Sequence, residues 1–276
     1  MKTLRLFFSA LLVGASGTAF AFDIGGLAKG VGERLATDKE KREQLGKGVT
    51  GLTVEEEINL GDAVSVEIVA RYGGVWRNVV ATQRVNLVGR ALTRYARRES
   101  LDWRFGLLDS DAVNAFSAPN GRVFITRGLY KLLGSDDELA GVLAHEIAHV
   151  DLRHAAKIIA GKQGTGAVAG LVAESAGDQA PAALSPATQA LEDGVAKLVT
   201  GLLTDGYGPG REYDADETAY DLAKVCGFDP NGLRIALNKV EANTAHTKET
   251  FNTHPKTSDR LKKLPGGEEK KKGKGK

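Results

Sequence analysis

The sequence predicts a mostly helical α+β domain with a small sheet of three to four strands. Apolar residues recur at helical spacing from about residue 53 to 97, and again from about residue 135 onward. Between Trp103 and Arg127 the apolar period shortens to that of strands, and two turn-forming stretches divide this segment into three runs. Because the strands are grouped between helices instead of alternating with them, the class is α+β.

Residues 1–21 are predicted to form a cleavable signal peptide. Lys2 and Arg5 precede an apolar run at 6–15, and a small-x-small site ends at Ala21 with no cysteine nearby to carry a lipid. We therefore expect export, most simply to a bacterial periplasm. An uncleaved anchor is the alternative, but this run is shorter than the ~18 apolar residues of a membrane span, and no later run of the mature chain reaches that length.

The charge of the mature chain is balanced. Two of the 37 basic residues and none of the 35 acidic residues lie in the first 21 positions, so 35 of each remain. This balance does not indicate the excess of basic residues that nucleic-acid binding requires, and no nucleic-acid partner is expected. Residues 265–276 form a Lys- and Gly-rich tail that we expect to be disordered and able to contact an anionic surface weakly. The single Cys226 excludes an internal disulfide.

The first helices follow a Gly-rich leader segment at 22–52. Thr53 and Glu56 form a capping box ahead of one helical apolar pattern, and a second pattern runs over 79–97. We assign residues 53–264 to a single domain. The strands of its sheet are expected near 103–107, 113–116 and 122–126.

Residues 145–149 read His-Glu-Ile-Ala-His and fall within a helix predicted over 135–160, directly after the sheet. Four helical residues advance about 400°, so His145 and His149 project from one face at a spacing that suits two imidazoles on one zinc ion. Glu146 then lies beside the metal, where its carboxylate can take a proton from a zinc-activated water. The pattern predicts hydrolysis of an amide bond with one Zn²⁺ per chain.

A catalytic zinc usually needs a third protein ligand. The metzincin pattern does not supply it, because Leu152 stands at the expected Gly position and His154 falls one residue short. The best candidates are Glu212 and Asp216, which lie one turn apart on the same face of a predicted helix. One can bind the metal while the other orients a ligand imidazole. Spacing does not decide between them, and a solvated acidic helix face is the plain alternative.

The strands before this helix have a functional interpretation. A protease must hold its substrate extended, and an exposed strand edge does so through backbone hydrogen bonds. The alternative is that these strands only build the core.

Four motifs in order make the sequence similar to the HtpX-like zinc metallopeptidases, the family that also contains the CaaX prenyl protease. The similarity is to its soluble periplasmic branch, which includes BepA and LoiP. The motifs are Asn114-Ala115-Phe116 with Pro119 and Gly121, His145 to Val150 followed by His154, Arg211 to Asp216, and Thr253-His254-Pro255 with Arg260.

The resemblance implies a metallopeptidase fold and a set of roles. It implies that the zinc ligands are His145, His149 and Glu212. It further implies that Glu146 is the general base and that the Asp216 carboxylate orients a ligand imidazole. His254 and Arg260 become further catalytic candidates. His254 would either donate to the oxyanion or occupy the open zinc position as a reversible latch, and Arg260 would support the developing charge or position His254. From the residues alone, His254 reads only as a loop histidine.

The resemblance also points to Asn114, Ala115 and Phe116 as the substrate-binding strand edge. Ser117 and Asn120 stand where the family more often has Ala and Gly. Those departures leave the metal site intact and weaken the expectation for the edge.

These expectations describe a zinc endopeptidase that hydrolyses misfolded or unassembled cell-envelope proteins, outer-membrane proteins among them. One alternative is a chaperone or assembly factor whose zinc site is latched and largely inactive. Another is a structural zinc domain without activity. The segment 161–190 either gates the cleft or forms a plain surface loop.

Overall fold

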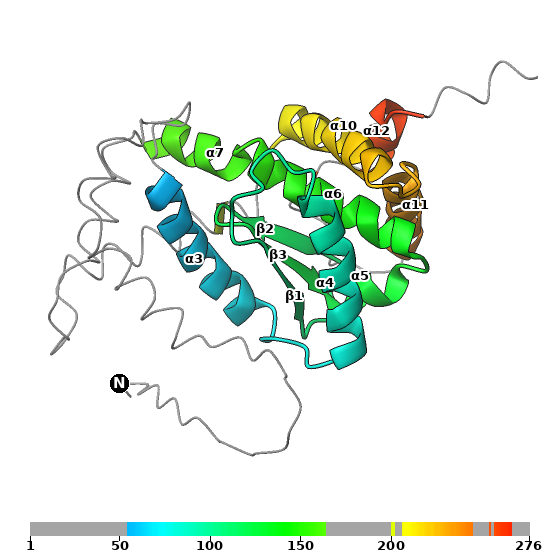
Figure 1. Ribbon diagram of the computed structural model, residues 1–276, viewed down its shortest axis with the longest axis horizontal. Coiled ribbons are helices and arrows are strands. Elements are labelled where there is room, and N and C mark those ends of the chain that lie inside the picture. Colours follow the sequence, from blue (N-terminus) through cyan, green and yellow to red (C-terminus); the bar gives the residue numbers. More distant parts are fainter. Residues whose placement is uncertain (1–53, 164–199, 202–205, 245–253, 255–256, 267–276) are drawn as a thin grey trace, which may run out of the picture.

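The computed structural model describes residues 54–163, 200–201, 206–244, 254 and 257–266. The predicted signal peptide, the leader and nearly all of the insert and the tail therefore lie outside the described residues. Figure 1 shows the arrangement of the elements. They are α3 (Val54–Arg71), α4 (Val79–Thr93), β1 (Arg104–Leu108), β2 (Ala115–Ala118), β3 (Arg122–Thr126), α5 (Arg127–Leu132), α6 (Asp136–Asp151), α7 (His154–Gln163), α10 (Pro209–Val225), α11 (Gly232–Thr244) and α12 (Thr257–Lys263).

The sheet has the order β1-β3-β2, with β3 parallel to β1 and antiparallel to β2. The hairpin between β2 and β3 turns at Gly121, whose φ of 83° lies in the left-handed region that glycine adopts without strain. These strands confirm the predicted α+β class and the predicted small sheet. The order leaves β2 at one edge.

Apolar cores form on both faces of the sheet. Val123 and Ile125 of β3 belong to the core shared with α4 and α6, whereas the intervening Phe124 belongs to the core under α3. This alternation follows from the two-residue period of a strand. Figure 1 accordingly shows α3 on one side of the sheet and α4 with α6 on the other.

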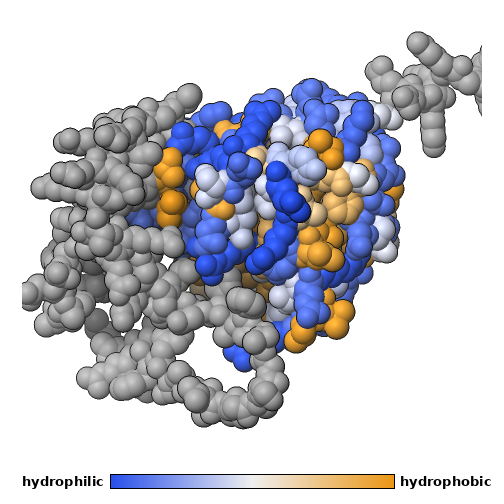
Figure 2. All heavy atoms as spheres, in the orientation of Figure 1, coloured by the Kyte–Doolittle hydropathy of each residue, from blue (hydrophilic) through white to orange (hydrophobic). Residues whose placement is uncertain are grey.

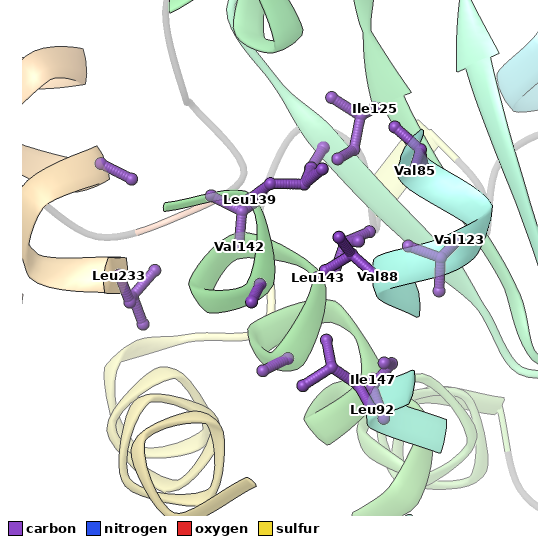
Figure 3. Close-up of a cluster of buried hydrophobic side chains, with 14 of the residues drawn as sticks. Val85, Val88, Leu92, Val123, Ile125, Leu139, Val142, Leu143, Ile147 and Leu233 are labelled. Carbon is purple, nitrogen blue, oxygen red and sulfur yellow. The ribbon is translucent and has the colours of Figure 1, made fainter. Parts of the chain in front are cut away.

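Helix α6 lies at the centre of the larger core, and every residue from Glu138 to Val150 is buried. Figure 3 shows its apolar side chains packed against β3, α4 and α11. Helix α11 approaches so closely that a Cβ on Gly141 would come within 2.2 Å of the Leu233 backbone nitrogen. The helix that carries the HExxH residues is therefore fixed on several sides before any metal is considered.

The predicted helix over 135–160 is not continuous, and this part of the prediction is wrong. It divides into α6 and α7 at Leu152 and Arg153. Arg153 has a φ of 57°, a left-handed conformation that costs a non-glycine residue roughly 1–2 kcal/mol. The capping residue is observed, because the Ser135 side chain accepts from the Glu138 backbone N–H.

The surface is mostly hydrophilic in the view of Figure 2, with separate apolar patches. Among the residues that the structure describes, the most exposed large apolar side chains belong to α4, where Val79, Val80 and Leu87 are 67–75% exposed. Among the described residues, none of the helices is both long and apolar enough to cross a membrane.

Candidate metal centre

Helix α6 carries three polar side chains into the interior. His145, Glu146 and His149 are each no more than 3% exposed, although apolar residues surround them. Uncompensated burial of two imidazoles and a carboxylate would be costly. Their partners, which come from α10, α12, the start of α7 and the single described residue His254, explain how this burial is tolerated.

Glu212 reaches the same place from the first turn of α10. That helix begins after Gly208, whose φ is 82°, and Pro209 occupies its first turn, where a missing N–H costs nothing. The Glu212 side chain is fully buried. Asp216, one turn later, is 3% exposed and projects from the same face, as the spacing predicted.

The Nε2 atoms of His145 and His149 and the Glu212 carboxylate form a triangle, in which each imidazole faces a different carboxylate oxygen. The two Nε2 atoms lie 3.0 Å apart, His145 Nε2 lies 3.4 Å from Glu212 Oε2, and His149 Nε2 lies 3.5 Å from Glu212 Oε1. Ligands about 2.0–2.2 Å from a tetrahedral zinc ion are separated by roughly 3.3–3.6 Å. Glu212 Oε1 is also buried without a hydrogen-bond partner among the described residues. The two imidazole–carboxylate distances match this separation, and the two Nε2 atoms lie about 0.3 Å closer together than it. Two imidazoles and a carboxylate with a spare oxygen are a donor set that fits a zinc ion.

His254 adds a fourth donor to this group. His145, His149, Glu212 and His254 each offer an atom within 4.8 Å of the others. His254 Nδ1 lies 2.6 Å from Glu212 Oε2, and its Nε2 lies 4.0 Å from Glu146 Oε1. His254, which the sequence alone identifies only as a loop histidine, therefore lies close both to the candidate ligands and to the candidate base Glu146.

The imidazole of His145 is held by charged partners. Its Nδ1 lies 2.9 Å from Asp216 Oδ1. Arg260 of α12 holds Asp216 in turn, through Nη2 at 2.6 Å and Nε at 3.0 Å, in a buried two-point contact. The same guanidinium is 3.2 Å from His145 Nδ1. Arg260 therefore contacts the orienting carboxylate more closely than it contacts any metal ligand.

On its Nδ1 side and its ring face, the imidazole of His149 has aromatic neighbours in place of a carboxylate. Its Nδ1 lies 2.8 Å from Nδ1 of His154, the first residue of α7. Tyr207 stacks on its face with ring centroids 4.0 Å apart and an interplanar angle of 22°. His154 is 2% exposed. Two aromatic side chains thus take the place that Asp216 takes beside His145.

The pKa values of His145 and His149 shift in opposite directions, in keeping with their different neighbours. Burial and Arg260 lower the pKa of His145, but Asp216 and Glu212 outweigh them and raise it to about 9. Burial dominates for His149 and holds its pKa well below the usual value. Burial, with Lys157 and Arg211 nearby, lowers the pKa of His154 to about 4. Without a metal, protons therefore favour His145 and avoid the His149 side.

The two acidic candidates remain ionised despite burial. Burial raises the pKa of Asp216, but Arg260 and His145 lower it by a larger amount and leave it at about 2. Burial is likewise outweighed at Glu212, where His254 and His149 hold the pKa well below its ordinary value. Both carboxylates can thus act as anionic partners at neutral pH.

The three predicted substrate-edge residues occupy different surroundings. Ala115 lines a small apolar depression together with Glu146, His145, Val142 and part of α11. Its backbone N–H donates to Asn114 Oδ1 at 2.9 Å. The Phe116 ring packs in the core under α3, 4.4 Å from the Tyr72 ring. Of the three, Ala115 is the one beside the metal donors.

Sequence reasoning missed two neighbours of His149. In the sequence, His154 stands one residue short of the metzincin position and within the second family motif, and neither observation places it against His149. None of the four motifs includes Tyr207. Its position five residues before Glu212 and ahead of Gly208 and Pro209 is the signal that could have identified it.

Known proteins resemble this chain over the part that holds the site. The model of Peptidase family M48 matches residues 80–267. The beta-barrel assembly-enhancing proteases of Yersinia pestis and Escherichia coli (strain K12) are 27% and 26% identical over 76% of this chain and 43% of their own length. Metalloprotease LoiP of the same E. coli strain is 28% identical over 55% of this chain and 57% of its own length. The chain spans less than half the length of the beta-barrel assembly-enhancing proteases that it matches.

Proposed function

The chain belongs to the metallopeptidases of family M48, and on that premise we propose that it is a zinc-dependent endopeptidase acting on misfolded or unassembled cell-envelope proteins. The observation that carries this proposal is the donor triangle of His145, His149 and Glu212, with sides of 3.0–3.5 Å. The buried Glu146 follows His145 on the same helix.

The proposed roles follow from the chemistry of each side chain. His145, His149 and Glu212 hold the metal, and Glu146 accepts a proton from the attacking water and later delivers it to the leaving amine. When bound, zinc makes that water more acidic and polarises the scissile carbonyl. Asp216 orients His145 by accepting its Nδ1–H.

His254 and Arg260 have separate roles in this proposal. His254 lies 4.0 Å from Glu146 and is the candidate to donate to the charge that develops on the carbonyl oxygen. Arg260 has its two-point contact with Asp216, and we assign it to positioning that carboxylate and to balancing its charge.

The substrate class rests on three supports. Relatives at 26–27% identity are named beta-barrel assembly-enhancing proteases. The predicted signal peptide directs the chain to the periplasm, where unassembled outer-membrane proteins are substrates within reach. The depression beside Glu146 has an apolar lining that includes Val142, Leu233 and Leu237, so the surface next to the candidate base is apolar, as the side chains exposed by unfolded polypeptides often are. Ala115 is the strand-edge residue nearest to that depression.

A second candidate function is a chaperone or assembly factor with a latched site. The position of His254 favours it, because this residue offers a donor within the same 4.8 Å group as the three proposed ligands. A histidine bound in the open position would exclude substrate. His254→Ala would then increase cleavage, whereas it would decrease cleavage if His254 donates to the oxyanion.

The test is cleavage of unfolded casein by the zinc-loaded protein without its signal peptide, beside the variant Glu146→Gln. Loss of the general base should lower the rate by roughly 10²–10⁴. Zinc content and the unfolding transition of both proteins serve as controls. If both bind zinc and neither cleaves, the endopeptidase proposal fails. Retained prevention of aggregation by the variant would then favour the chaperone.

A further inference from the structure

The tautomer of His149 must be fixed if this residue binds a metal through Nε2. A neutral imidazole has one protonated and one unprotonated ring nitrogen, so a lone pair on Nε2 requires the proton on Nδ1. That Nδ1–H needs an acceptor because His149 is 1% exposed. The atom at hydrogen-bond distance is His154 Nδ1, 2.8 Å away.

His154 reaches this position through the break between α6 and α7. In a continuous helix, residues five apart project about 140° from each other, and His154 would face away from His149. The left-handed Arg153, with its φ of 57°, ends α6 and reverses this direction. The break is therefore what brings the second imidazole to the first.

A cluster of ion pairs around the buried Glu57 stabilises the strained turn. Arg153 Nη2 lies 2.5 Å from Glu57 Oε1 of α3, and the Glu57 side chain is fully buried. Arg98 contacts the other oxygen of Glu57 at 2.8 Å and donates to the Val150 carbonyl at 3.2 Å. Asp151, the last residue of α6, accepts from the backbone N–H groups of Arg97 and Arg98. Strain supported in this way is typical of a functional site.

We propose that His154 is a positioning residue of the metal centre, which accepts the Nδ1–H of His149 and so keeps the Nε2 lone pair of His149 directed at the metal. His154 fills the role that Asp216 fills for His145, with a neutral ring in place of a carboxylate. The inference rests on the proposed zinc site and adds a residue that lies outside the ligand set.

Two substitutions separate hydrogen bonding from space filling. The Oδ1 atom of asparagine stands the same number of bonds from Cα as the Nδ1 atom of histidine, so His154→Asn keeps an acceptor. His154→Phe keeps an aromatic ring without one. Loss of a group that orients a metal ligand typically weakens metal binding by roughly 10–100-fold.

The experiment is competition for zinc between the protein and a chromophoric chelator at neutral pH. We expect His154→Phe to weaken binding by roughly 10–100-fold, and His154→Asn to stay within about threefold of wild type. The inference is overturned if both variants match wild type, or if both are equally weakened. A wild type that binds no zinc would instead refute the proposed function, so the two failures are distinct.

A second measurement needs no variant. In zinc-loaded protein with ¹⁵N-labelled histidine, NMR should report His154 as a neutral ring protonated on Nε2, and His149 as protonated on Nδ1. A proton on His154 Nδ1 would leave two donors facing each other, and this result would overturn the inference even if His154→Phe failed to fold.

Discussion

The two histidines of the HExxH sequence lie one turn apart on the same helix, yet their surroundings differ. His145 is held by a carboxylate that is itself held by Arg260, and its environment favours a positive charge. His149 is held by His154 and Tyr207, and its environment favours a neutral ring. The five-residue motif therefore supplies two of the three proposed ligands, while residues outside the motif, from the nearby His154 to the distant Arg260, set the electrostatics of each one.

The largest loss of stability should come from disrupting the charged side of the centre, which consists of His145, Asp216 and Arg260. Arg260→Ala leaves Asp216 buried with its main partner removed, and the loss of one member of a buried ion pair costs about 3–5 kcal/mol. Urea unfolding of the metal-free protein measures this. Arg127→Ala is the matched control, since Arg127 pairs with Asp109 and Asp111 at the surface and should cost at most about 1 kcal/mol. Equal losses in the two variants would contradict the comparison.

Removing the charge without removing the shape gives a smaller effect. Asp216→Asn keeps a side-chain oxygen near His145 but loses the anion, and we expect zinc binding to weaken by roughly 10–100-fold. Chelator competition measures it. If zinc binding is unchanged, the charge of Asp216 does not affect metal binding by His145. The difference in charge between the surroundings of His145 and His149 would then have no effect on the metal.

The pH dependence of the metal-free protein should separate the two sides. The folded pKa of His145, about 9, lies above its ordinary 6.5, so its stabilisation is complete below pH 6.5 and is lost as the pH rises through 9. The folded pKa of Asp216, about 2, lies below 3.8, so its contribution is lost as the pH falls from 3.8 through 2. Denaturation midpoints across pH measure both, and Asp216→Asn should flatten both limbs.

The groups beside His149 should give stability the opposite dependence on pH, so that stability rises with pH just below neutrality. The folded pKa of His154, about 4, lies below 6.5, so stability is lost as the pH falls from 6.5 toward 4. His154→Asn removes this titration and should reduce the slope in that interval, to which His149 also contributes because its pKa is lowered. His145 and Asp216 contribute no slope between pH 6.5 and 4, so a wild-type midpoint that does not fall over this interval would contradict the prediction.

The smallest effect is expected at Tyr207. Tyr207→Phe keeps the ring that stacks on His149 and should leave zinc affinity within about twofold. Tyr207→Leu removes the aromatic face, and because aromatic pairs contribute roughly 0.5–1.5 kcal/mol, it should weaken binding several-fold. Calorimetric titration resolves the two variants. Weakening in Tyr207→Phe would assign the effect to the hydroxyl instead of the ring.

The sequence predicted the α+β class and the three strands from local period, and helical spacing predicted that His145 and His149 share one face. Spacing left Glu212 and Asp216 as alternatives, and only the family resemblance implied Glu212 as the third ligand. The sequence could not predict the break at Arg153. A left-handed arginine has no local signal, and this one is stabilised by Glu57, about a hundred residues earlier. The roles of His154 and Tyr207 depend on that break and on the entry to α10, so they became visible only in three dimensions.

The separation of the site residues along the chain also affects the order in which the protein is assembled. His145 and Arg260 touch across 115 positions of sequence, whereas the sheet and α6 are neighbours in the chain. Contacts between distant segments form late, because closing a long loop costs entropy before the contact compensates for it. The sheet and α6 can therefore pack early, while the charged half of the metal centre waits for α12 to dock. A nascent chain would hold its two histidines without the arginine that fixes Asp216, and so would complete the proposed metal centre only near the end of folding.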